Sequence, residues 1–228
     1  MIVVVGQPLY RETEVEAILY GLPARIAVAA AGHARSVQLI GKAGEDQAGD
    51  AVVLALSRSG VGHVALLREA GRPTSRLEYP GHATIEVHET PTESTAIEDE
   101  PAATGLACAE APDVPALDAA DVDLALRYLT QFAVLVLADR ADPETARVAA
   151  AAASRADARL IVVVPAGETE PAGLPPDAIV FEAPDSDPDG VFAAMVGSFA
   201  AALDDGDEPA AAFRASVESG GWTPASAG

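Results

Sequence analysis

Short apolar runs alternate with segments of helical periodicity along most of this chain. Two continuous aliphatic runs, at 2–5 and 160–164, are typical of strands that are buried on both faces of a sheet. Further strands are predicted at 36–40, 132–137 and 178–181. Apolar residues at three- and four-residue spacing predict helices at 25–31, 46–59, 121–130, 143–155, 191–203 and 209–218. Because strands and helices alternate, we expect an α/β fold with a mostly parallel central sheet that is covered on both faces.

The middle of the chain departs from this alternation. Three short strands are predicted at 64–67, 76–79 and 84–88, and the turn residues Pro80 and Gly81 separate the last two. We expect residues 74–90 to form a small β flap outside the main sheet, and residues 91–116, which are rich in Pro, Glu, Thr and Ala, to form a loop. All 228 residues are then one domain.

The net charge limits the possible binding partners, and the cysteine content indicates the cellular compartment. The chain has 35 acidic against 14 basic residues and a formal net charge of −21, so its field repels nucleic acid and anionic membrane surfaces. The same field works against binding of ATP. A single cysteine, Cys108, excludes an internal disulfide and fits a reducing compartment. The apolar run at 1–5 is too short for a secretory signal, and we expect a cytoplasmic protein.

One motif lies between the predicted strand at 36–40 and the helix at 46–59. It reads Gly41-Lys42-Ala43-Gly44-Glu45-Asp46-Gln47-Ala48-Gly49-Asp50, and a Gly60-Val61 turn follows the helix. The stretch 121–167, with its buried strands and Ala-rich helix, continues the same order of elements. This set resembles the ribokinase-like (PfkB-type) carbohydrate kinases. The resemblance implies a three-layer ribokinase-like sandwich with a β flap as lid, and a homodimer that pairs through that flap.

The resemblance also implies site residues. Gly41 and Lys42 would lie at a sugar pocket, with Asp46 and Arg25 as further substrate contacts, and Gly190 and Gly197 would lie at the nucleotide. The ligand would be a small hydroxylated molecule, with ATP and Mg²⁺ as cofactors if the protein is active. Two alternatives stay open at this point. Asp46 can instead cap a strand–helix turn that is kept for folding, and Arg25 can be an ordinary surface residue.

The chain departs from the family where the family has its catalytic G-A-G-D motif. This chain reads Gly190-Val191-Phe192-Ala193, which places Ala193 at the position of the catalytic base and Phe192 at a glycine position where it would crowd a phosphate. Alanine cannot accept a proton. Asp187 and Asp189 lie just upstream and are possible substitutes for the base, or with Asp185 could hold a cation. The alternative is that they are solvated residues that cap the helix, and no defined metal site is expected.

Three functions therefore remain, of which the third is a different reaction on the same scaffold. The first is a catalytically degenerate relative of the sugar kinases that binds a small molecule or acts as a regulatory or partner protein. The second is an active ATP-dependent kinase that phosphorylates a hydroxyl of a sugar or nucleoside.

Overall fold

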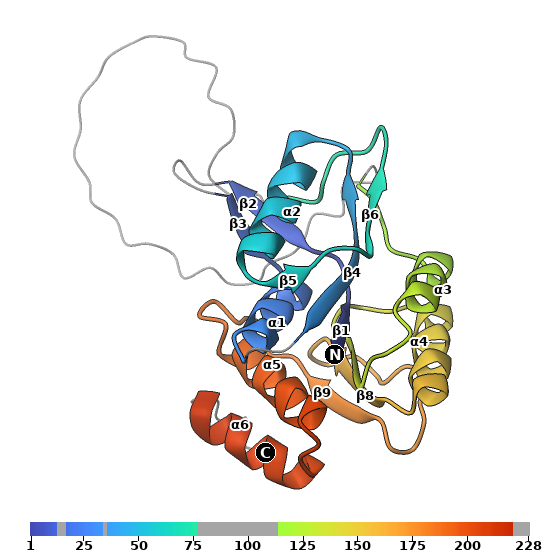
Figure 1. The fold of residues 1–228 in the computed structure, drawn as a ribbon, viewed down its shortest axis with the longest axis vertical. Coiled ribbons are helices and arrows are strands. Elements are labelled where there is room, and N and C mark those ends of the chain that lie inside the picture. The colour runs from blue at the N-terminus through green and yellow to red at the C-terminus, as the bar shows by residue number, and fades with distance from the viewer. Residues whose placement is uncertain (13–16, 34–35, 77–113, 221–228) are drawn as a thin grey trace, which may run out of the picture.

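The computed structural model describes residues 1–12, 17–33, 36–76 and 114–220 (Figure 1). Their centre is a seven-stranded sheet in the order β5-β4-β1-β7-β8-β9, with β6 also paired to β4. All of its pairings are parallel. The strands are β1 (Ile2–Val5), β4 (Val37–Gly44), β5 (Val61–Gly62), β6 (Leu66–Glu69), β7 (Val134–Leu137), β8 (Arg159–Val164) and β9 (Ile179–Glu182).

Helices cover both faces of this sheet. On one face lie α1 (Leu22–Ala31), α2 (Gln47–Arg58), α5 (Val191–Asp204) and α6 (Pro209–Gly220). On the other lie α3 (Ala119–Tyr128) and α4 (Pro143–Ala156). The expected three-layer α/β architecture is therefore confirmed. Within the described residues, no helix combines the length and apolar character that crossing a bilayer requires.

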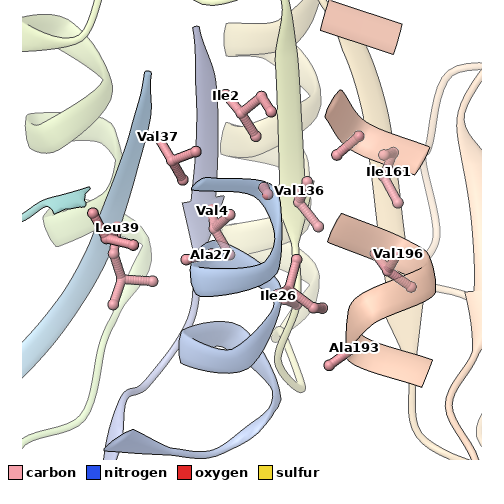
Figure 2. Close-up of a cluster of buried hydrophobic side chains, with 14 of the residues drawn as sticks. Ile2, Val4, Ile26, Ala27, Val37, Leu39, Val136, Ile161, Ala193 and Val196 are labelled. Atoms are coloured by element: carbon pink, nitrogen blue, oxygen red, sulfur yellow. The ribbon is translucent and has the colours of Figure 1, made fainter. Parts of the chain in front are cut away.

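The central strand β1 builds a hydrophobic core on each face of the sheet. Its even residues, Ile2 and Val4, belong to the core under α1, α2 and α5, part of which Figure 2 shows. Its odd residues, Val3 and Val5, belong to the core under α3 and α4. Since successive side chains of a strand point to opposite faces, a strand between two helical layers has to be apolar throughout, and this is why β1 reads as a continuous aliphatic run.

The predicted helices and the strands of the main sheet are all present, with differences at their ends. The strand predicted at 36–40 continues through Gly44, because its second half pairs with β6 from Gly41 to Gly44. The strand predicted at 64–67 is found as β6, which begins at Leu66 and ends at Glu69, and the two-residue strand β5 before it was not predicted.

A second, two-stranded sheet was not predicted. It consists of β2 (Leu9–Glu12) and β3 (Ala17–Tyr20), which pair antiparallel between β1 and α1. Tyr10 of β2 also bridges to Arg76, the first residue of a strand predicted at 76–79. The strand predicted at 84–88, with most of the flap 74–90 and of the loop 91–116, lies outside the described residues.

Candidate functional site

The carboxyl ends of β1 and β7 form the natural place for a ligand in this sheet. The chain passes from β1 to β4 on one side and later enters β7 on the other side, and open α/β sheets bind ligands where the strand order reverses in this way. Gly6 and Gln7 follow β1, and Asp139 follows β7. The backbone N–H of Gln7 donates to the Asp139 carboxylate at 3.0 Å. Gly6 has a φ of +156°, and a Cβ on it would lie 3.0 Å from the Asp139 Cβ.

Asp46 is engaged at the start of α2. As N-cap residue it accepts a hydrogen bond from the Gly49 N–H at 2.8 Å. It also accepts from the N–H of Thr74 at 3.0 Å and from the Thr74 hydroxyl at 2.5 Å. Burial alone would raise the pKa of Asp46, but these hydrogen bonds to the charged form hold it below its ordinary value. The carboxylate ties the helix to a segment 28 residues away, which is the folding role left open above.

The glycines of the 41–50 motif leave no room for side chains. A Cβ on Gly44 would lie 2.8 Å from the backbone nitrogen of Thr74 and would overlap the carbonyl oxygen of Arg72. A Cβ on Gly41 would lie 2.7 Å from the ring of Pro8. Close approach of neighbouring atoms therefore accounts for Gly41 and Gly44, without any ligand.

Lys42 is an ion-pair partner inside the protein. Its ammonium lies 2.7 Å from Asp121 of α3 and 3.5 Å from Glu69 of β6, and only 17% of the side chain is exposed. Burial alone would lower the pKa of Lys42, but the hydrogen bond and charge of Asp121, with those of Glu69, raise it overall. Side chains alternate between the two faces of β4, so Lys42 lies on the same face as Ile40. Ile40 belongs to the core under α3 and α4. The ammonium thus lies across the sheet from α5.

Arg25 lies in the first turn of α1 and holds the loop before α5. Its guanidinium donates to the carbonyl oxygen of Asp187, and to that of Pro188 at 3.0 Å. The guanidinium carbon also lies 5.5 Å from the ring centre of Tyr20. A Cβ on Gly190 would overlap this guanidinium, and the φ of +73° at Gly190 is one that glycine adopts readily. Arg25 therefore joins the starts of α1 and α5.

The carboxylate of Asp187 caps the amino end of α5. The Asp187 side chain accepts from the backbone N–H of Phe192 at 3.1 Å and from that of Ala193 at 3.0 Å. The first N–H groups of a helix have no partner within the helix, and they are the donors that would bind a phosphate. Phe192 and Ala193 are each 1% exposed and lie in the core shared with α1, where Figure 2 shows Ala193 near Ile26. Phe192 therefore points into the core and fills no cleft.

Gly197 lies one helical turn further along α5, at its contact with α1. A Cβ there would lie 2.6 Å from the Cβ of Ala29 and 2.8 Å from the backbone nitrogen of Ala30. Close packing of the two helices requires a glycine at this point. Helix packing accounts for Gly197, and nothing in its surroundings tests the expected nucleotide contact.

The remaining carboxylates before α5 are solvated. Asp185 and Asp189 are exposed, and only Asp187 is half-buried. Within the described ranges, no group of three or more His, Cys, Asp or Glu side chains is placed to hold a metal ion. With the amides of α5 already bonded to Asp187, the residues present do not fit an ATP–Mg²⁺ phosphate group at this helix.

The feature that the sequence did not reveal is Asp139, beside a cavity of about 310 Å³ at the carboxyl ends of β7 and β8. Asp139 is exposed at the surface, and the protein atoms around it raise the pKa of this carboxyl despite hydrogen bonds from the N–H groups of Gln7 and Arg140. Among the described residues, the Oε1 atom of Gln7 is buried and accepts no hydrogen bond. A carboxylate directly after a buried strand was the available signal.

The comparisons with known proteins agree with this architecture. No family model and no curated protein matches the sequence. Among solved structures, ribokinase from Arabidopsis thaliana, complexed with ribose and ATP, matches with a TM-score of 0.57 and 15% identity, over 96% of this chain and 90% of that chain. Ribokinase from Giardia lamblia matches with a TM-score of 0.58 and 15% identity, over 96% and 94%.

A candidate ribokinase II from E. coli, in complex with ATP and Mg²⁺, matches with a TM-score of 0.58 and 13% identity, over 96% of this chain and 91% of that chain. At these identities the similarity is one of fold. The chain therefore has a ribokinase-like fold, as its motifs indicated.

Proposed function

We propose that this protein is a ribokinase-fold binding protein that takes a small hydroxylated molecule at the carboxyl edge of its sheet and does not transfer phosphate. One observation supports the absence of phosphate transfer. The Asp187 carboxylate accepts from the N–H groups of Phe192 and Ala193, so the donors that would stabilise a transferring phosphoryl group are bonded to an internal anion.

The other residues of the expected site support the same function. Lys42 is paired with Asp121 and Glu69, and Asp46 is bonded to Thr74. Ala193 offers no base and points into the core. Lys42, Asp46 and the first amides of α5 are therefore already used by the fold, while the cavity beside Asp139 keeps a carboxylate within reach of a ligand.

The alternative is an active sugar or nucleoside kinase, which the fold shared with ATP-bound ribokinases favours. In that case Asp189, exposed before α5, would act as base, and Asp187 would leave the helix on nucleotide binding. A homodimer through the flap at 74–90 also stays a prediction, because most of that segment lies outside the described residues.

The deciding experiment is calorimetric titration of the full chain with ATP–Mg²⁺, alone and with pentoses, hexoses and nucleosides, followed by an ADP-release assay with the same panel. We expect no nucleotide binding and no ADP release. Asp187→Ala is the matched variant, because it frees the two N–H groups and should give weak phosphate or nucleotide binding. Micromolar ATP binding and sugar-dependent ADP release by the unmodified protein would overturn the proposal.

A further inference from the structure

The cavity at the carboxyl ends of β7 and β8 has one apolar wall and one charged side. Residues of the turns after the two strands and of the loop at 165–172 line it, and it is open to solvent. Its apolar lining is formed by Ala141, Pro143, Val162, Val163, Val164, Pro165, Pro171 and Ala172. A volume of about 310 Å³ lies at the lower end of the range of ligand sites and fits a single sugar ring.

The charged side of the cavity is acidic. Its lining contains three carboxylates, Asp139, Glu168 and Glu170, against one guanidinium, that of Arg140. Arg140 is already paired with Glu168, with nitrogen and oxygen 2.8 Å apart. The Arg140–Glu168 pair is neutral overall, so the carboxylates of Asp139 and Glu170 give the lining a net negative charge. The whole chain also has a net charge of −21. Such a field draws cations in and keeps phosphates out.

Asp139 is the carboxylate that would meet a ligand. From the residues that the structure describes, it accepts hydrogen bonds from two backbone N–H groups, those of Gln7 and Arg140, and the neighbouring Arg140 guanidinium is paired with Glu168. A carboxylate whose protein donors are neutral backbone groups gains most from a further donor that is itself positively charged. An ammonium supplies that charge, and hydroxyl groups on the same molecule can use the remaining acceptor positions.

We propose that the cavity beside Asp139 binds a small hydroxylated molecule that carries an ammonium group, with Asp139 as the residue that selects the amine. This rests on the proposed function, because it names the chemical class of the ligand for the same site. It reverses the charge preference that a nucleotide or sugar-phosphate site would have.

A matched pair of probes tests the proposal. Glucosamine and glucose differ by one ammonium in place of one hydroxyl, so calorimetric titration of the full chain with each isolates the charge. We expect glucosamine to bind about tenfold or more tightly than glucose, as a charge-assisted hydrogen bond predicts. We also expect that preference to shrink as salt is added.

Variants locate the effect. Asp139→Asn should remove the preference for glucosamine, whereas Asp177→Asn, which removes the same charge from an exposed residue outside the lining, should keep it. Ala172→Trp keeps Asp139 but fills the cavity, and should weaken binding of both sugars. Far-ultraviolet circular dichroism and the thermal midpoint identify a variant that fails to fold, in which case Ala172→Trp, on an exposed loop residue, carries the test.

The outcomes are distinct. Equal binding of glucosamine and glucose, or a preference that survives Asp139→Asn, would overturn this inference and leave the proposed binding function standing. Binding of neither sugar would overturn both the inference and the proposed site. The absence of phosphotransfer is measured separately with ATP–Mg²⁺ and does not depend on either result.

Discussion

Replacing Asp46 with alanine is the most direct test of whether the 41–50 motif holds the fold together in this chain. The substitution removes the acceptor for three donors, namely the Gly49 N–H and the N–H and hydroxyl of Thr74. Loss of a helix cap costs about 1 kcal/mol. Thr74 is 2% exposed, so its N–H is left buried without a partner, which costs about 1–3 kcal/mol more. We expect a loss of about 3 kcal/mol in the free energy of unfolding.

The assay is urea denaturation followed by circular dichroism. Asp46→Asn keeps one acceptor oxygen but turns an amide group toward the Thr74 N–H, so its loss should lie between zero and that of alanine. Asp50→Asn is the control in the same helical turn, because Asp50 pairs with Arg68 at the surface with 76% of its side chain exposed. The control should cost less than about 1 kcal/mol.

The same interaction has a pH signature. Since the pKa of Asp46 is lowered in the folded protein, its contribution is present above the ordinary carboxyl value of 3.8 and is lost as pH falls through the lowered native pKa. The Asp46→Ala protein should therefore lose less stability on acidification than the unmodified protein. A loss below about 1 kcal/mol at neutral pH, equal to that of the control, would refute the structural role and return Asp46 to the ligand site.

Three further substitutions test the neighbouring assignments. Ala193→Asp places a carboxylate in the core and should cost about 3 kcal/mol or more in urea denaturation without creating kinase activity; ADP release by this variant would contradict the placement of Ala193. Lys42→Met should lower the free energy of unfolding below pH 10.5, and its difference from wild type should vanish as pH rises through the raised pKa of Lys42. If the two proteins instead lose stability equally between neutral and alkaline pH, the ion pair with Asp121 contributes nothing to stability. Gly44→Ala should cost more than about 2 kcal/mol because of the Arg72 carbonyl, and a thermal midpoint equal to that of wild type would exclude the close approach.

Much of the fold could be predicted from the sequence because the central strands are buried on both faces. The aliphatic runs at 2–5 and 160–164 admit few other structures, and β1 and β8 are found there. The short strand β2 was missed because Pro8, Arg11 and Glu12 interrupt any apolar alternation there, and β3 is a run of only four residues. Their pairing depends on each other and on Arg76, a contact that no local pattern records.

The site could be predicted only as a set of residues and not as a geometry. The resemblance to the ribokinase-like kinases singled out the motif at 41–50 and the segment at 190–193, where it implies Ala193 at the position of the base. Asp139 was not selected, because a single carboxylate after a strand carries no distinctive spacing. Its importance follows from the strand order, which places it beside Gln7, 132 residues away in the sequence.

The sequence by itself determined the α/β class, the strand–helix order and the residue types at the edge of the sheet, because these follow from local periodicity and composition. Only the tertiary structure decided what the polar residues do. Lys42 meets Asp121 across 79 residues of sequence, and Arg25 meets the carbonyl oxygen of Asp187 across 162. Whether a charged side chain faces a ligand or another part of the chain depends on such distant partners, and hydrophobic patterning specifies where a side chain lies without specifying what it will meet.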